Sequence, residues 1–454
     1  MIDDLANLVA ALPAGAVLTD RDVVASYRQD WARDPAAGWP RAVVRASCTA
    51  DVQAVLRWAT ACRVPVVPRG AGSGLSGGST AVDGGIVLCL EQMREIHIDA
   101  VSRVAITQPG RLNVEVKRAA AEHGLWYPPD PSSFEICSIG GNAATNAGGL
   151  CCVKYGVTTD YVLGMEVVLA DGTALRLGGP RLKDVAGLSL TKLFVGSGGI
   201  LGVITELTLR LVPAPPPAST LVAAFRSIES AADAVLAITG RLRPSMLELM
   251  DRTSINAVED MVAMGLDRSA EALLIARSDA PGAAAANEIS LMASACQANG
   301  ASEQYTTSDP DEGDAFAAAR RAAFPALQRL GSLLLEDVGV ALPNLPVLVR
   351  GVEAIAAANR VTIAVVAHAG DGNTHPLVVY DADDPGATAR AYAAFGAVMD
   401  LALDLGGTIS GEHGVGRLKK DWLPAYLGAD VMNLTRKIKD ALDPEHILNP
   451  GAIL

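Results

Sequence analysis

The chain has 454 residues, more than one ordinary domain holds, so its length predicts two domains or three subdomains. Half of the residues are hydrophobic, which is enough to form large buried cores. The formal charge of -13 at pH 7 argues against a nucleic-acid partner, because phosphate backbones are bound by clustered Lys and Arg. The seven cysteines lack the paired CxxC spacing of zinc ribbons and iron–sulfur clusters, and we expect reduced thiols.

The first 70 residues alternate short helical and extended patterns. Helices are predicted near residues 5–12 and 22–28, a strand at 42–46, and an amphipathic helix at 50–62, where apolar residues recur at helical spacing. A buried strand at 64–68 then runs directly into the glycine-rich segment PRGAGSGLSGG.

This first glycine-rich segment fits the GxGxxG pattern through Gly72, Gly74 and Gly77. A Rossmann loop must open a helix that receives the pyrophosphate, but here more glycines follow and no helix is predicted. The segment also lacks the GK[ST] ending of a Walker loop. We therefore expect a run of backbone N–H groups that wraps a diphosphate, with a flexible surface loop as the alternative.

Two more glycine clusters follow in the same part of the chain. CSIGGNAATNAGG, starting at Cys137, sets small polar side chains among glycines, and GSGGILG at residues 196–202 leads into a strand. Between them, GMEVVLADGTALRL predicts a hairpin that turns at Asp171 and Gly172. Three glycine-rich loops carried on strands favour a long, narrow ligand. PAPPPAS then reads as a linker.

The region beyond the linker interleaves strands with Ala-rich helical stretches, which predicts a sheet with helices on one face. The expected domains are residues 1–217, 218–406 and a closing segment, 407–454, that returns to the first domain. The expected helices are at residues 228–240, 283–298, 312–330, 344–358 and 387–405.

HAGDGNTH places His368 at the end of one strand and His375 at the start of the next, so their imidazoles can converge on one point. Two imidazoles and a carboxylate are a common divalent-metal set, and Glu412 in SGEHGVG is the third candidate ligand. Alternatively, the histidines only satisfy loop groups, because Asp371 and Asn373 could occupy their ring nitrogens.

Six motifs in order resemble the FAD-linked oxidases of the vanillyl-alcohol-oxidase type, in the group of D-lactate dehydrogenase, glycolate oxidase and D-2-hydroxyglutarate dehydrogenase. The motifs are PRGAGSGLSGG, IGGNAATNAGG, GGILGVITELTLRLVP, HAGDGNTHPL, SGEHGVGRLKK and LDPEHILNPGAIL. The resemblance implies an α+β fold: a two-subdomain FAD-binding domain of the p-cresol-methylhydroxylase (PCMH) type, and a cap domain with an antiparallel sheet covered by helices.

The resemblance also implies bound FAD. We expect noncovalent FAD because the first loop has no His or Cys, although Cys137, Cys151 and Cys152 leave covalent attachment as an alternative. The expected cofactor-binding residues are Pro68, Arg69, Gly70, Ala71, Gly72, Ser73, Gly74, Leu75, Ser76, Pro131, Ser138, Gly140, Gly141, Asn142, Thr145, Asn146, Gly148, Gly149, Gly199, Gly202, Ile204 and Asn449.

In the resembling family the positions of His368, His375 and Glu412 bind a divalent metal, often zinc, and the histidine matching His413 is the base. The family's substrate carboxylate is bound by an arginine that matches Arg320 or its neighbour Arg321, and we favour Arg320. The other three histidines, His97, His123 and His446, lie in no such motif and are expected at the surface or at helix ends.

The expected activity is oxidation of a small D-2-hydroxy acid, D-lactate or glycolate, to the 2-oxo acid by hydride transfer to flavin N5. D-2-hydroxyglutarate is the alternative substrate, disfavoured because LLLEDVGVALP lacks the lysine of those enzymes. A flavin-carrying subunit without activity is another alternative, and an NAD enzyme rests on GxGxxG alone.

The chain has no cluster motif of its own, so its electron acceptor is expected to be a partner subunit, a quinone or a soluble carrier. A homodimer is left open. The N-terminus lacks the features of a signal peptide and no apolar run spans a bilayer, which favours a cytoplasmic protein, or one held peripherally at the membrane by its acceptor.

Overall fold

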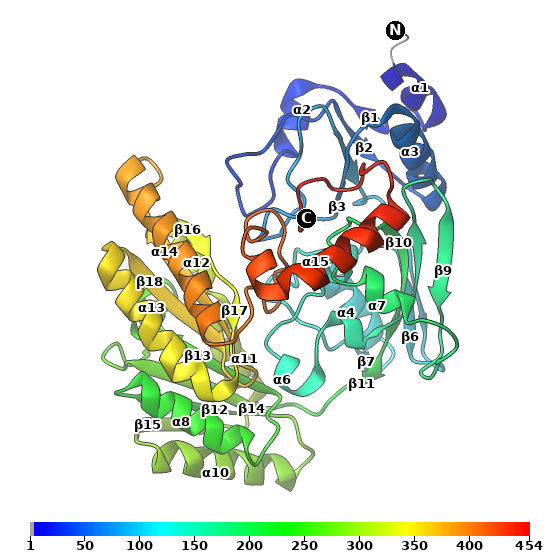
Figure 1. Ribbon diagram of the computed structural model, residues 1–454. Helices are drawn as coiled ribbons and strands as arrows, with labels where there is room; N and C mark the ends of the chain where they lie inside the picture. Colours follow the sequence, from blue (N-terminus) through cyan, green and yellow to red (C-terminus); the bar gives the residue numbers. More distant parts are fainter. Residues whose placement is uncertain (1–3) are drawn as a thin grey trace. The chain divides into compact units, whose positions relative to one another are not determined.

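The computed structural model describes residues 4–454 and divides them into two compact units (Figure 1). The first unit consists of the segment that ends at Gly148, Val157–Ala214 and Glu412–Leu454. The second consists of Gly149–Gly156 and Pro215–Gly411. The domain limits expected from the sequence, after residues 217 and 406, stay predictions.

The first sheet of the first unit has the strand order β1-β2-β4-β3, with β2, β4 and β3 parallel and β1 antiparallel. Helix α3, which connects β2 to β3, buries Val52, Val55 and Leu56 in the core of this sheet. It ends at Arg63, which adopts a left-handed conformation. The elements are α1 (Asp4–Ala11), β1 (Val17–Leu18), α2 (Arg21–Ser26), β2 (Ala42–Arg45), α3 (Thr49–Cys62), β3 (Val66–Arg69) and β4 (Ile86–Cys89).

The second sheet of the first unit is antiparallel, in the order β5-β6-β10-β8-β9. The predicted hairpin is confirmed: β8 pairs with β9 across a turn in which Gly172 has a φ of 81°. The strands are β5 (Ile96–Asp99), β6 (Val104–Thr107), β8 (Val162–Val168), β9 (Ala174–Gly178) and β10 (Val203–Arg210), with β7 (Leu125–Trp126) and β11 (Val212–Pro213) paired separately. The helices are α4 (Asn113–Ala121), α5 (Ile139–Thr145), α7 (Leu190–Phe194) and α15 (Leu423–Leu442).

The second glycine cluster, expected as a loop, contains helix α5. Ser138 caps this helix, because its hydroxyl accepts a hydrogen bond from the N–H of Gly141 at 3.3 Å. Gly140 packs so tightly that a Cβ would lie 2.4 Å from the Cβ of Pro109. The glycine therefore allows a close approach of two chain segments, a role that the sequence pattern did not reveal.

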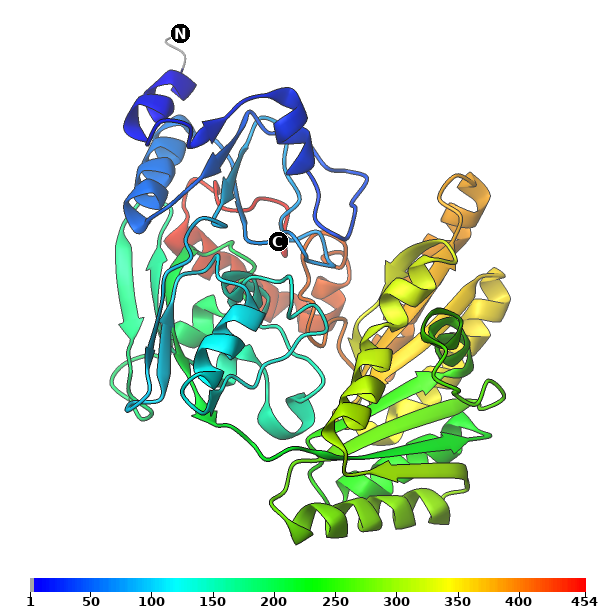
Figure 2. The same ribbon diagram turned by 180° about the vertical axis from the view of Figure 1, so that it is seen from behind.

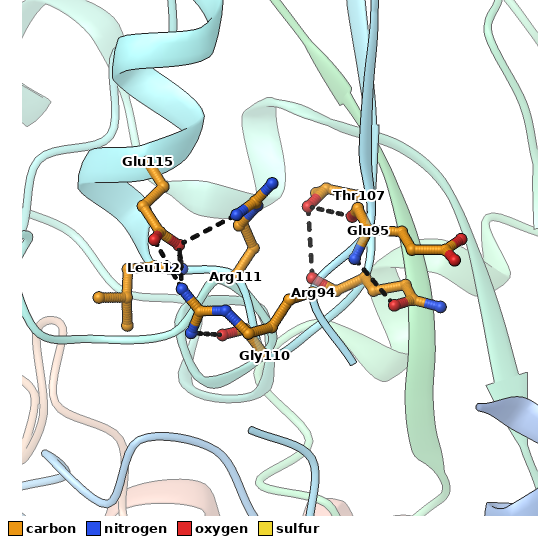
Figure 3. A network of polar contacts seen from close by, with 8 residues as sticks. Arg94, Glu95, Thr107, Gly110, Arg111, Leu112 and Glu115 are labelled. Atoms are coloured by element: carbon orange, nitrogen blue, oxygen red, sulfur yellow. Dashed lines mark hydrogen bonds and ion pairs between the residues drawn. The ribbon is translucent and has the colours of Figure 1, made fainter. Parts of the chain in front are cut away.

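A polar network holds the turn against which α5 packs (Figure 3). Glu115 accepts hydrogen bonds from the guanidinium of Arg94 at 2.6 and 2.7 Å and from the N–H of Leu112 at 3.0 Å. Arg94 also donates to the carbonyl oxygen of Gly110 at 3.3 Å. Because the adjacent Pro109 accepts from the N–H of Gly140 at 2.9 Å, this network positions the start of the second glycine cluster.

The second unit is built on one antiparallel sheet with the strand order β15-β12-β14-β13-β18-β19-β16, in which β17 also pairs with β19. The antiparallel sheet expected for this region is confirmed. The strands are β12 (Ser219–Phe225), β13 (Met246–Asp251), β14 (Ala272–Ser278), β15 (Ala301–Thr307), β16 (Ser332–Leu335), β17 (Val338–Gly339), β18 (Thr362–His368) and β19 (Asn373–Tyr380).

Helices cover both faces of this sheet, so the expectation of helices on one face was wrong (Figures 1 and 2). The central strands are buried on both faces, as in β14, where six of seven residues are buried. One face carries α9 (Arg252–Val262), α11 (Pro310–Arg321) and α12 (Ala323–Gln328). The other carries α8 (Ile228–Thr239), α10 (Ala283–Ala298), α13 (Leu345–Asn359) and α14 (Pro385–Asp404).

Four of the five expected helices of this region are confirmed, and the fifth, at residues 312–330, is two helices. The break at Ala322 precedes Pro325, which has no N–H to donate and whose ring would clash with the carbonyl of Arg321 in a continuous helix. The remaining short helix, α6 (Cys152–Tyr155), also belongs to the second unit. Among residues 4–454, no helix is long and apolar enough to span a membrane.

Candidate functional site

The two histidines of HAGDGNTH lie where β18 and β19 meet in the second unit. His368 pairs with Asn373, so His375, two residues further along β19, projects from the same face of the sheet. Gly372 allows the turn between the strands with a φ of 84°. The imidazole centroids are 5.0 Å apart, the ring planes meet at 87°, and the side chains are buried. The strand register therefore brings both rings to one place, as the sequence predicted.

Each imidazole has a fully buried carboxylate beside its Nδ1 atom. Oε1 of Glu248 lies 2.7 Å from Nδ1 of His368, and Oδ1 of Asp337 lies 3.7 Å from Nδ1 of His375. The first distance is that of a hydrogen bond, whereas the second is longer than a hydrogen bond. A carboxylate on Nδ1 orients an imidazole so that its Nε2 faces a metal ion. These partners are not Asp371 or Asn373, the neighbours that the alternative interpretation of the sequence considered.

Strand pairing explains the position of both carboxylates. Leu249 pairs with Ala367, which places Glu248 opposite His368, although the two residues are 120 positions apart in sequence. Asp337 follows β16 and accepts a hydrogen bond from the hydroxyl of Ser410 at 2.8 Å. Motif spacing carried no signal for either acid, because both contacts depend on the register of distant strands.

The two candidate arginines differ in their packing. Arg320 lies in the last turn of α11, only 3% exposed, and its Nε is 2.9 Å from Oε2 of Glu248. Arg321 is half-buried on the same helix. Through Glu248, Arg320 is therefore connected to the histidine cluster, and the choice of Arg320 as the substrate arginine stays a prediction.

Glu412 and His413 are the first two residues of the closing segment of the first unit. The preceding residue, Gly411, donates its N–H to the carbonyl oxygen of Asp337 at 3.0 Å within the second unit. The carbonyl oxygen of His413 accepts from the hydroxyl of Ser76 at 3.4 Å, which places this residue beside the first glycine loop. The predicted metal set draws on both units and stays a prediction.

The first glycine loop follows β3, which ends with Pro68 and Arg69, and no helix begins in it. Within the described chain, none of the backbone N–H groups from Gly72 to Gly78 donates to another protein group. The Arg69 side chain covers Gly72, where a Cβ would lie 2.1 Å from a guanidinium nitrogen. A run of N–H donors beside a buried arginine suits an anionic group such as the diphosphate of FAD.

Asp30 also lies under this loop, although no motif in the sequence marks it as a site residue. Its carboxylate is buried and accepts from the N–H of Ala32 at 3.1 Å and of Ser79 at 3.3 Å. Burial raises the pKa of the Asp30 carboxyl from 3.8 to about 6, against the opposing effects of these N–H donors and of Arg69. A charge near Arg69 therefore titrates close to neutral pH.

Asn449 connects two of the glycine loops. Its buried Nδ2 donates to the carbonyl oxygens of Gly78 at 2.8 Å and Gly198 at 2.7 Å. Next to Gly198, Gly199 has a φ of 74° and lies close to Pro68. The closing LNPG motif thus holds the first and third loops at a defined spacing, which is what a ligand lying across both would need.

Two side chains of the second cluster that were predicted to bind the cofactor form hydrogen bonds within the first unit. Asn142 is buried, accepts from the side chain of Asn113 at 3.0 Å and donates to the sulfur of Cys137 at 3.2 Å. Asn146 accepts from the N–H of Thr159 at 2.8 Å. The first unit also contains the predicted residues Pro131, Ser138, Gly140, Gly141, Thr145, Gly148, Gly202 and Ile204, whereas the predicted residue Gly149 is assigned to the second unit.

Comparison with protein families gives two matches that together cover most of the chain. A model described as "FAD binding domain" matches residues 40–178, and one described as "FAD linked oxidases, C-terminal domain" matches residues 214–453. The first range holds the first glycine loop and the whole of the second cluster. The second range holds the histidine cluster, Glu412, His413 and Asn449.

Several curated proteins are similar over almost the whole chain. Glycolate oxidase subunit GlcD of Bacillus subtilis is 40% identical over 91% of this chain and 88% of its own length. D-lactate dehydrogenase of Archaeoglobus fulgidus is 34% identical over 100% of this chain and 99% of its own length. D-2-hydroxyglutarate dehydrogenase of Xanthomonas citri pv. viticola is 34% identical over 98% of this chain and 96% of its own length.

Solved structures confirm the fold that the sequence predicted. p-Cresol methylhydroxylase with substrate bound superimposes with a TM-score of 0.84 at 19% identity, covering 99% of this chain and 95% of that one. 4-Ethylphenol oxidase from Gulosibacter chungangensis gives a TM-score of 0.80 at 18% identity, with 99% and 97% coverage. At this identity the likeness concerns the fold alone.

Proposed function

This chain belongs to the family of FAD-linked oxidases, and from that premise we propose that it oxidises a small D-2-hydroxy acid to the 2-oxo acid. D-lactate and glycolate are the preferred substrates, in line with the names of the relatives from Archaeoglobus fulgidus and Bacillus subtilis. The observation that carries the proposal is the buried pair of His368 and His375, each with a carboxylate at Nδ1. Such a pair suits a metal-assisted oxidation better than a purely structural turn.

Separate residues of this chain would bind the metal, remove the proton and bind the carboxylate in the proposed reaction. His368, His375 and Glu412 would hold a divalent ion, zinc by the family resemblance, which as a Lewis acid lowers the pKa of a substrate hydroxyl. His413 takes the hydroxyl proton, a contribution of roughly 10²- to 10⁴-fold to the rate. Arg320 attracts and orients the substrate carboxylate.

The flavin site is proposed to use the loops of the first unit. Bound FAD supplies the acceptor for the Cα hydrogen, which leaves as hydride. The N–H donors of residues 72–78 and the guanidinium of Arg69 would hold its diphosphate. Asn449 maintains the spacing between the loops from which FAD is held. We propose noncovalent FAD, since the first loop has no Cys or His.

The electrons then pass to an acceptor outside this chain. We propose a partner subunit before a quinone or a soluble carrier, because the relatives from Bacillus subtilis and Escherichia coli are both named as subunits. Oxidation of D-2-hydroxyglutarate is the second candidate. It is supported by the name of the Xanthomonas citri relative, which is 34% identical over nearly the full chain.

Anaerobic bleaching of the flavin absorbance band tests the proposal directly. The purified protein is mixed with glycolate and with the separate enantiomers of lactate and 2-hydroxyglutarate, before and after chelation of metal. We expect rapid bleaching by D-lactate or glycolate that is lost on chelation and restored by zinc. Fastest bleaching by D-2-hydroxyglutarate would select the second candidate, and no bleaching by any of these acids would overturn the proposal.

The role of His413 is tested by His413→Gln against a matched control, His97→Gln. His97 is an exposed histidine on β5 and belongs neither to the predicted metal set nor to the glycine loops. We expect His413→Gln to slow bleaching by roughly 10²-fold or more while FAD content stays unchanged. His97→Gln should bleach like the natural protein, and equal rates in both variants would exclude His413 as the base.

A further inference from the structure

Glu248 contacts two predicted site residues at once. Its Oε1 atom lies 2.7 Å from Nδ1 of His368, and its Oε2 atom lies 2.9 Å from Nε of Arg320. The side chain of Glu248 is 0% exposed, and those of His368 and Arg320 are each 4% exposed. One carboxylate thus connects a predicted metal ligand with the predicted substrate arginine.

Apolar core residues also surround Glu248. Met246 and Met250, its neighbours on the same face of β13, belong to the buried core, together with Ile275 and Val366 of the adjoining strands. Burying a charged pair costs several kcal/mol per ion, and apolar residues of similar size are often at least as stabilising. Core packing alone therefore does not account for a glutamate at this position.

We propose that Glu248 is a positioning residue that prepares His368 for metal binding and aligns Arg320 for the substrate carboxylate. The hydrogen bond to Nδ1 sets the tautomer of His368, so that Nε2 is the atom presented to the ion. The ion pair through Nε fixes the plane of the Arg320 guanidinium. This inference rests on the proposed function and adds one residue that couples its two binding tasks.

Zinc affinity provides a test that does not depend on activity. The dissociation constant is measured by competition with a chromophoric chelator for the natural protein and for Glu248→Gln and His368→Ala. Loss of a carboxylate partner behind a metal-binding histidine costs 10- to 100-fold in affinity, so Glu248→Gln should bind zinc weaker by that factor. Cobalt(II) in place of zinc should show a shifted visible spectrum in this variant.

Asp251→Asn is the matched control. Asp251 lies on the same strand, and its carboxylate accepts from the N–H of Ser254 at 2.8 Å as the cap of α9. We expect the stability of this variant to change little, because an Asn side chain caps a helix about as well as an Asp side chain. Its zinc affinity and its cobalt spectrum should match those of the natural protein, because the changed side chain caps a helix.

A second variant covers the case in which Glu248→Gln does not fold. Glu248→Leu combined with Arg320→Met removes both buried charges and leaves no unpaired ion. We expect this protein to fold and to bind FAD, but to bind zinc 10- to 100-fold more weakly. Because Arg320 is not a proposed zinc ligand, natural zinc affinity in the double variant would overturn the inference.

The outcomes separate this inference from the proposed function. If His368→Ala loses zinc while Glu248→Gln binds it like the natural protein, the role of Glu248 is wrong and the metal site stands. If the natural protein and His368→Ala bind zinc equally weakly, the metal-assisted function fails and the inference fails with it. Bleaching of FAD by a D-2-hydroxy acid without any bound metal would likewise show that the oxidation is not metal-assisted, and the role proposed for Glu248 would fail with it.

Discussion

Gly416 lies against the carbonyl oxygen of Ser76 so closely that a Cβ would be 2.0 Å from that oxygen. The N–H of the next residue, Arg417, donates to the same oxygen at 2.8 Å. Through this contact the segment that carries His413 packs directly on the first glycine loop. The catalytic proposal for His413 therefore depends on a glycine three residues away, where the backbone also has a φ of 52°.

Gly416→Ala should release this packing. We expect a loss of FAD content and a lower melting temperature, because the added methyl group must push the loop away and the left-handed backbone strains a residue with a Cβ. Gly84→Ala is the control, since Gly84 has a φ of 70° but no atom within 4 Å of an added Cβ. It should cost only about 1 kcal/mol of strain. Equal FAD loss in both variants would contradict the packing argument.

Removal of metal should destabilise the natural protein. An ion that binds only the folded state adds about 2.7 kcal/mol at a free concentration 100-fold above its dissociation constant. We expect chelation to lower the melting temperature and zinc to restore it. In His375→Ala neither treatment should change the melting temperature, because a ligand is missing. A melting temperature of this variant that still responds to zinc would argue against His375 as a ligand.

Asn449→Asp should separate the first and third glycine loops. The carboxylate has nearly the same shape as the amide but cannot donate to the carbonyl oxygens of Gly78 and Gly198. We expect a cost on the order of 1–3 kcal/mol and weaker retention of FAD on gel filtration. The control, Asn359→Asp, changes an amide that donates to Ile355 at the end of α13 in the second unit. Its FAD content should stay unchanged.

Asp30 should make stability fall as pH rises toward neutrality. Its folded-state pKa of about 6 exceeds the value of 3.8 expected for the unfolded chain. The folded state therefore binds more protons between these pH values, and stability decreases across this window and is level above it. The shift corresponds to about 3 kcal/mol. Of this total, roughly 1.3 kcal/mol should be lost between about pH 5 and about pH 7, which urea unfolding of the natural protein at these two pH values can measure.

Asp30→Asn supplies the comparison for that measurement. Without a titrating carboxylate beside Arg69, its contribution to the pH dependence disappears, and the variant should gain stability relative to the natural protein as pH rises. An identical pH dependence in the two proteins would show that other groups dominate the window.

Lys439 and Asp443 form a buried ion pair in the closing segment. Lys439 also donates to the carbonyl oxygens of Ile200 and Leu448, each at 2.8 Å. Lys439→Met leaves the carboxylate buried without its cation, which should cost roughly 3–5 kcal/mol in the free energy of unfolding. Adding Asp443→Asn should recover much of that loss. Lys437→Met, at an exposed position of α15, should change stability little.

Local patterns in the sequence were enough to predict several features. The GDGN turn between His368 and His375, the hairpin at Gly172 and the missing helix after the first glycine loop were all correctly predicted. Each depends on residues close together in the chain, where turn chemistry and strand alternation act directly. The family resemblance also predicted the fold class and FAD as the cofactor.

The sequence by itself determined many of the strands, the turn between the two histidines and the hairpin at Gly172, because neighbouring residues specify these features through backbone conformation. Strand β13, which carries Glu248, was not predicted. Only the tertiary structure decided that Glu248 faces His368, that Arg320 pairs with the same glutamate, and that Asp30 lies under the glycine loop. The reason is physical: these contacts follow from strand register and helix packing between segments up to 120 residues apart. Their side chains carry no local pattern, because a buried charge is specified by its partner across the fold.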